Sequence, residues 1–104
     1  MAERRRPMKP QERQTAAENL AVAALGFIAA EPERLGRFLA LSGIGPDSIR
    51  AAAREPQFLA GVLDHLTADE RLLLAFSAEN DINPEAVMRA RDVLAGPDWE
   101  RDTP

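Results

Sequence analysis

The sequence contains no cysteine and no tyrosine, and it has a single histidine. Without cysteine the chain has no disulfide, no thiolate zinc site and no cysteine nucleophile, and a reducing compartment such as the cytoplasm is the expected location. Aromatic residues make up only 5% of the chain, so leucine, alanine, valine and isoleucine must fill the interior. Such a core suits packed helices better than a β-sandwich.

Long apolar runs are also absent. The longest, Leu20 to Ala30, spans 11 residues, whereas a helix that crosses a bilayer needs about 20. The positively charged start of the chain is followed by no apolar segment before Leu20, so we expect neither a secretory signal nor a membrane anchor. These features together predict a cytoplasmic protein.

Charge is distributed unevenly along the 104 residues, whose net charge is −4. Residues 1–14 carry +3, residues 15–54 are neutral, and residues 55–104 carry −7. The basic start, with prolines among charged residues and glutamine, predicts a disordered arm over residues 1–14. We expect one helical domain over residues 15–95 and a polar tail over residues 96–104.

Proline marks the expected helix boundaries. It fixes φ near the helical value and disfavours helix for the residue before it, so an X-Pro step separates one helix from the next. Two Thr-x-x-Glu patterns, typical of capping boxes, add two further helix starts. The predicted helices begin at Thr15, Pro32, Pro46, Pro56, Thr67 and Pro84, and they end near Ala30, Gly43, Arg54, Leu66, Asn80 and Leu94. The sequence thus predicts an all-α fold, a compact orthogonal bundle of five to six short helices.

Apolar residues within these segments recur at helical spacing. From Phe58 to Leu66 they form an unbroken stripe at i, i+1, i+4, i+5 and i+8, which predicts a buried face. The run from Leu20 to Ala30 is apolar around its whole circumference. We therefore expect its helix to be central and surrounded by the others.

Two stretches carry a resemblance to a known family. They are EPERLGRFLALSGIGPDSIR at residues 31–50 and EPQFLAGVLDHL at residues 55–66, and the similarity continues through Asp69-Glu70 and Ile82-Asn83-Pro84-Glu85. Over roughly residues 16–94 the chain resembles a family of small bacterial proteins classed as a domain of unknown function. The resemblance implies a bacterial, cytoplasmic, helical protein and supplies no activity, cofactor or site residue.

The turn Gly43, Ile44, Gly45 allows two interpretations. It resembles the hairpin of helix-hairpin-helix DNA-binding modules, in which backbone N–H groups contact phosphate. Asp47 departs from that pattern because it places a negative charge where such modules have a basic or neutral residue. In the alternative, Gly43 ends a helix in the left-handed conformation, Ile44 packs back on that helix, and Pro46 begins the next one.

Patterns typical of catalysis are missing from the sequence. His65 stands beside Asp64 near the end of a predicted helix, where a histidine interacts favourably with the helix dipole. The carboxylates of Asp69 and Glu70 suit helix capping better than acid-base chemistry. We therefore expect a protein that is not an enzyme and that uses no metal or cofactor.

A module that binds another protein is the function we expect. An arginine surface between the second and third helices is one candidate for contacting an acidic partner or a phosphate, and Trp99 in the polar tail is another. The arginines are Arg34, Arg37, Arg50 and Arg54. Alternatively, the arginines form a solvated face and Trp99 packs on the domain itself. The second functional hypothesis is nucleic-acid binding through the glycine turn and the basic arm, which the acidic second half would oppose.

Overall fold

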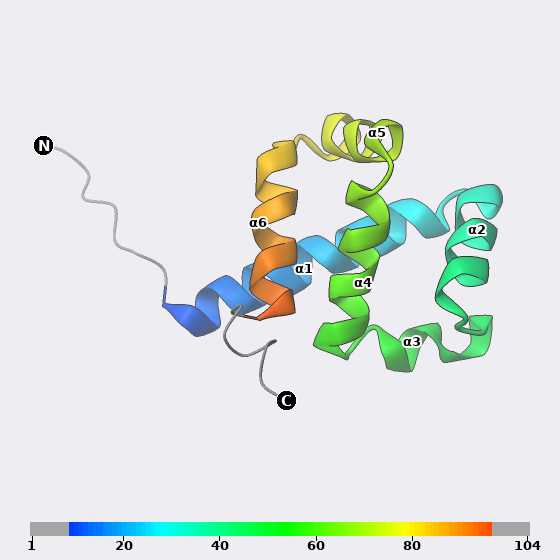
Figure 1. Ribbon diagram of the computed structural model, residues 1–104, viewed down its shortest axis with the longest axis horizontal. Helices are drawn as coiled ribbons and strands as arrows, with labels where there is room; N and C mark the ends of the chain where they lie inside the picture. Colours follow the sequence, from blue (N-terminus) through cyan, green and yellow to red (C-terminus); the bar gives the residue numbers. More distant parts are fainter. Residues whose placement is uncertain (1–8, 97–104) are drawn as a thin grey trace, which may run out of the picture.

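The computed structural model describes residues 9–96 as a bundle of helices, and no strand occurs in that range (Figure 1). In chain order the elements are α1 (Pro10–Ala29), α2 (Pro32–Ser42), the 3₁₀-helix η1 (Pro46–Ser48), α3 (Ile49–Ala52), α4 (Pro56–Thr67), α5 (Glu70–Asn80) and α6 (Pro84–Ala95). The predicted all-α fold is confirmed. No helix in the described range is long and apolar enough to cross a membrane.

Proline begins the elements where the sequence predicts. Pro32, Pro56 and Pro84 are the first residues of α2, α4 and α6, and Pro46 is the first residue of η1. The predicted third helix is not one continuous α-helix, because the 3₁₀ turn of η1 is followed by the single α-helical turn of α3. Neither of these two short elements contains a buried residue.

The first helix begins at Pro10 rather than at Thr15. Lys9 precedes it in extended conformation, and the Lys9 backbone N–H donates to the carboxylate of Glu12 at 3.1 Å. Proline at the first helical position has no N–H that needs a partner, and the acid at the third position accepts the N–H of the residue before the helix. Both features are typical of a helix start. The predicted disordered arm is therefore wrong for residues 10–14, which are helical, whereas residues 1–8 lie outside the described part of the chain.

Neither predicted capping box forms. Glu18 accepts a hydrogen bond from the Gln14 side chain at 2.9 Å, within the interior of α1. Thr67 is the last residue of α4, and its hydroxyl donates to a carbonyl of the preceding turn at 2.9 Å. The cap of α5 is instead Asp69, whose carboxylate accepts two backbone N–H groups at 3.1 and 3.3 Å. The predicted cap of α6, Asn83, is confirmed by a hydrogen bond of 2.9 Å.

Helices α1, α4 and α6 pack on one another around the apolar core. The stripe predicted on α4 faces this core, and only Phe58 at its start is partly exposed. Phe27 of α1 meets Phe76 of α5 edge to face, with ring centroids 5.5 Å apart. The largest fully buried side chains are Ile28, Val62, Leu63, Leu66, Phe76 and Val87.

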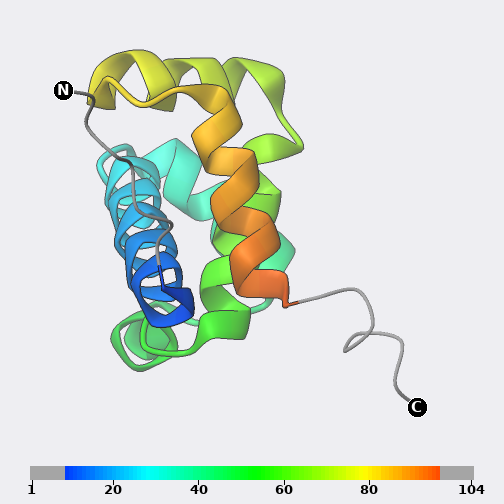
Figure 2. The same cartoon turned by 90° about the vertical axis from the view of Figure 1, so that its left-hand side faces the viewer.

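One side of α1 faces solvent, so the prediction of a surrounded central helix is wrong. Figure 1 shows α1 running behind α4 and α6, and Figure 2 shows the same helix at the edge of the bundle. Val22 is 48% exposed, and Ala23 and Gly26 are also exposed. Because two of these residues are small, the apolar area left in water is modest.

Helix α2 packs against α1, contributes the buried Phe38 to the core, and is linked to α4 through η1 and α3 (Figure 1). Gly43 ends α2 with a φ of 74°, the left-handed value expected of a helix-terminating glycine. The chain then passes along α3 and returns through α4, so that the C-terminal half of α2 lies beside α4.

Candidate functional site

An apolar groove of about 500 Å³ lies between the C-terminal half of α2 and α4. Hydrophobic and aromatic side chains supply most of its walls, and a few polar groups stand at the rim. The residues that line this groove, called the apolar groove below, are Phe38, Leu41, Ser42, Ile44, Gln57, Phe58, Gly61, Asp64, His65 and Ala68.

Helical spacing brings these side chains together. Phe38 and Leu41 are three residues apart on α2, and Phe58 and Gly61 are three residues apart on α4, so each pair lies on one face of its helix. A Cβ added at Gly61 would meet nothing within 4 Å. The missing side chain at position 61 therefore keeps the groove open.

The bottom of the groove is fixed and its rim is exposed. Phe38 is 3% exposed and meets two rings edge to face, Phe58 at 5.8 Å and His65 at 5.2 Å between centroids. Leu41, by contrast, is 72% exposed, the highest value among the large hydrophobic residues that the structure describes. An apolar ligand would find a preformed aromatic surface and a leucine that is free to cover it.

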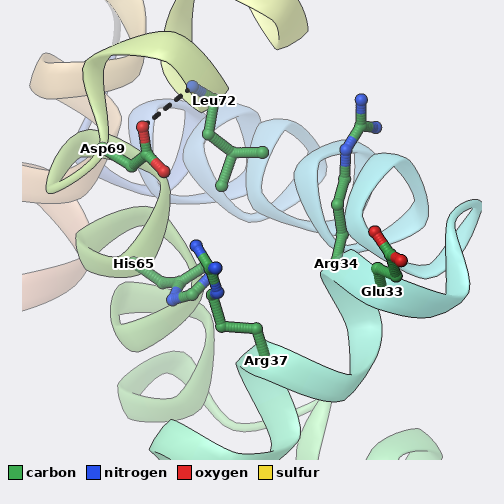
Figure 3. Close-up of a pocket in the computed structure, with 6 residues that line it drawn as sticks. All are labelled: Glu33, Arg34, Arg37, His65, Asp69 and Leu72. Atoms are coloured by element: carbon green, nitrogen blue, oxygen red, sulfur yellow. Dashed lines mark hydrogen bonds between the residues drawn. The ribbon is translucent and has the colours of Figure 1, made fainter.

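A smaller, charged pocket of about 190 Å³ adjoins the groove (Figure 3). His65 lines both the charged pocket and the apolar groove, so it lies at the boundary between them. In Figure 3 the Arg37 side chain rises from α2 to meet His65 of α4, and a dashed line marks the bond from the Leu72 backbone to Asp69. The residues of this charged pocket are Glu33, Arg34, Arg37, His65, Asp69 and Leu72.

Burial controls the protonation of His65. It lowers the pKa of the imidazole below the ordinary value of 6.5, Asp69 opposes this shift, and the Arg37 guanidinium adds to it. His65 is therefore neutral at pH 7. The attraction of the α4 C-terminus for a charged histidine, which the sequence suggests, is outweighed by the loss of solvent.

Comparison with known proteins places the chain in a family. The sequence model of one family matches residues 14–97, which is most of the chain. The chain belongs to the DUF3572 family. The family's description is "protein of unknown function". This match agrees with the resemblance to a domain of unknown function that the sequence showed. No curated protein and no solved structure matches this DUF3572 chain.

Two of the four arginines that the sequence grouped line the charged pocket. Arg34 and Arg37 line the charged pocket, where the Arg34 guanidinium lies 4.2 Å from the centroid of the Phe27 ring. Arg50 belongs to α3 and Arg54 follows it, and neither lines this pocket. The predicted surface therefore contributes two arginines to the site. Trp99, the other predicted contact residue, lies outside the described residues.

Hydrogen bonds within the chain occupy the glycine turn. The Gly43 N–H donates to the Leu39 carbonyl at 2.9 Å, and the Ile44 N–H donates to the Ser42 hydroxyl at 3.3 Å. The Gly45 carbonyl accepts a bond of 3.0 Å from the backbone at the end of η1. This arrangement favours the helix-terminating alternative over phosphate contact. Ile44 gains a role that the sequence did not suggest, since it forms part of the apolar groove.

The sequence pattern predicted that Phe58 lies on a buried face and did not identify the groove between α2 and α4. One signal was present, since Gly61 lies three residues after Phe58, beside the apolar stripe of α4, where a glycine leaves the helix surface open. In the described part of the chain, no group of three or more histidine, aspartate or glutamate side chains could hold a metal ion.

Proposed function

We propose that this DUF3572 protein is a non-catalytic interaction module whose apolar groove binds a segment of another protein. The observation that carries the proposal is the 72% exposure of Leu41 beside Phe38, Ile44 and Phe58. Apolar area removed from water contributes roughly 25 cal/mol per Å², so a side chain left this exposed can still gain by burial. Hydrophobic grooves between helices are a recurring docking place for helical segments.

The partner segment combines a large apolar side chain with an acidic one. The groove suits the apolar side chain, and the neighbouring charged pocket offers Arg37, which has no ion pair among residues 9–96. The nearest acid on the groove side, Asp64, lies 3.8 Å from Arg91, which partly neutralises its charge. Glu33 and Asp69 also line the charged pocket, so the preference for an acidic partner depends on Arg37, whose guanidinium has no carboxylate of residues 9–96 within ion-pair distance.

Simple energetics support a moderate affinity. Burial of Leu41 and of one large apolar side chain from the partner would contribute roughly 1.5 to 3 kcal/mol each. The apolar contacts and an acid contact must exceed the cost of association, which is itself several kcal/mol. We therefore expect a complex with a dissociation constant of roughly 1 to 100 μM.

Peptide selection on the immobilised full-length chain tests this function and requires no named partner. Peptides enriched from a random display library would be labelled, and their binding would be measured by fluorescence anisotropy. Leu41→Asp is expected to weaken binding at least about tenfold, because it places a charge at the rim of the groove. Leu74→Asp is the matched control, since Leu74 is also exposed, at 50%, but lies on α5 away from the groove.

Two results would contradict the proposed function. The first is a set of selected peptides that lose the same affinity for Leu41→Asp and Leu74→Asp, which would place their site elsewhere. The second is a selection that yields no binder to the folded chain. Far-UV circular dichroism of each variant confirms that the comparison is made between folded proteins.

A further inference from the structure

Arg37 and His65 lie side by side in the charged pocket, where the apolar groove ends (Figure 3). Arg37 comes from α2 and His65 from α4, and the guanidinium is close enough to act electrostatically on the imidazole. We infer that these two side chains form an oxyanion site, which takes the carboxylate of the acidic residue in the bound partner segment. The inference rests on the proposed function and names the residues that recognise the acid.

Two of the other polar groups of the pocket are engaged within the chain. Asp69 caps α5 by accepting two backbone N–H groups. The Arg34 guanidinium stacks over the Phe27 ring at 4.2 Å, and its Nη1 donates to the Phe27 carbonyl at 3.5 Å. Within residues 9–96, however, neither Arg37 nor His65 has a hydrogen bond or an ion pair. Glu33 has no such partner either, but Figure 3 shows its carboxylate near Arg34 and apart from Arg37 and His65, so these two are the nitrogen-bearing side chains left to hold an anion.

A carboxylate matches both the size and the donors of the site. The pocket of about 190 Å³ has room for one such group beside the side chains that line it. The Arg37 guanidinium offers parallel N–H donors in the fork geometry that fits two carboxylate oxygens. Protonated His65 adds a further N–H donor and a second positive charge.

The positions of the charged pocket and the apolar groove along α2 set the spacing expected between the acid and the apolar anchor of the partner. Along α2, residues 33–37 contribute to the charged pocket and residues 38–42 contribute to the apolar groove, so the two are about one helical turn apart. A helical partner that lies along α2 would then carry its acid three or four residues from its apolar anchor.

Binding of the carboxylate should be coupled to protonation of His65. The charged groups that act on this histidine are Arg37 of α2 and Asp69, the N-cap of α5. Glu33 and Arg34 of α2 line the same pocket, and Asp64 of α4 lines the adjoining groove. In the free protein, burial keeps the pKa of His65 low, and Arg37 adds to this effect against Asp69. A bound carboxylate stabilises the imidazolium and raises that pKa. Affinity should therefore increase as the pH falls toward the pKa of the free histidine.

Proton NMR provides a direct test, because His65 is the only histidine in the chain. Its ring protons would be followed through a pH titration of the full-length protein in sodium chloride and in sodium acetate at equal ionic strength. We expect acetate to raise the pKa of His65 and to bind at least about threefold more tightly at pH of about 5.5 than at pH of about 8. Arg37→Gln should abolish the response to acetate, and Arg50→Gln, a change on α3, should preserve it.

A second arm uses the selected peptides and separates this inference from the proposed function. Glutamine in place of the peptide's acid should weaken binding about tenfold to the unmodified chain and about twofold or less to Arg37→Gln. The selected peptides could lose affinity for Leu41→Asp and yet bind the unmodified chain equally well with the acid or with glutamine. That result would leave the proposed function intact and overturn the oxyanion site. Equal titration curves in chloride and acetate would also overturn it. Inorganic phosphate is the third arm, and a response to phosphate without one to acetate would contradict recognition of a carboxylate.

Discussion

His65 of α4 stands edge-on to Phe38 of α2, with ring centroids 5.2 Å apart and an angle of 74° between the ring planes. This contact closes the bottom of the apolar groove, and His65 also lines the charged pocket. One residue pair thus joins the apolar groove to a histidine whose pKa burial lowers below its ordinary value. The pH dependence of stability and the binding properties should both depend on it.

Stability should fall as the pH is lowered through about 6.5. The unfolded chain takes up a proton at His65 near its ordinary pKa of 6.5, whereas burial lowers that pKa in the folded state. Between the lowered pKa of the folded state and 6.5, the unfolded state therefore binds more protons than the folded state. The contribution of His65 to the free energy of unfolding is complete above this pH range and decreases as the pH falls through it. Urea unfolding of the unmodified chain and of His65→Gln, between pH of about 5.5 and about 8, measures the difference. Parallel pH profiles for the two proteins would show that other groups cause the loss.

Gly43→Ala should lower the free energy of unfolding by roughly 1 kcal/mol. An added Cβ at this position meets nothing within 4 Å, so the cost comes from the φ of 74° and not from a clash. Gly45→Ala is the matched control, because Gly45 has an ordinary φ of −78° and equal space around it. Chemical denaturation midpoints of the two variants provide the comparison. Equal midpoints would mean that the left-handed turn is not maintained in solution.

Ser77→Ala should raise the free energy of unfolding by up to about 1 kcal/mol. Ser77 is 7% exposed, and its hydroxyl has no hydrogen-bond partner among the described residues. Removal of a buried, unpaired hydroxyl relieves its desolvation. Ser42→Ala provides the contrast, since the Ser42 hydroxyl accepts from the Ile44 N–H at 3.3 Å and its loss should destabilise the α2 terminus. Thermal unfolding that ranks the two variants in the opposite order would contradict this account of both hydroxyls.

Helix boundaries were predictable where proline determines them. Pro32, Pro56 and Pro84 begin helices in the structure because the ring restricts φ locally, whatever the rest of the fold does. The Thr-x-x-Glu patterns at Thr15 and Thr67 misled because the same residues also occur inside or at the end of a helix. A threonine hydroxyl that bonds to the preceding turn, as in α4, is compatible with helix and gives no start signal.

The binding groove was not predictable because it depends on how two helices approach each other. Periodicity marked Phe58 as part of an apolar helix face, but it carries no information on whether the facing helix fills the space beside it. Similarly, Arg34 and Arg50 belong to the same predicted surface in sequence, yet only Arg34 lines the charged pocket. Arg50 belongs to the short α3, which follows α2 after the 3₁₀ turn of η1.

Filling the apolar groove from within is the most direct test of the proposed function. Gly61→Leu would extend a side chain into the groove from a position with nothing within 4 Å of its Cβ, and Gly61→Ala would add the Cβ alone. Both changes should preserve or increase helix stability, because glycine is roughly 1 kcal/mol less favourable than alanine within a helix. We predict that Gly61→Leu lowers the affinity for selected peptides at least about tenfold and that Gly61→Ala changes it about twofold or less. Unchanged peptide affinity in a folded Gly61→Leu protein would contradict the assignment of the α2–α4 groove as the binding site.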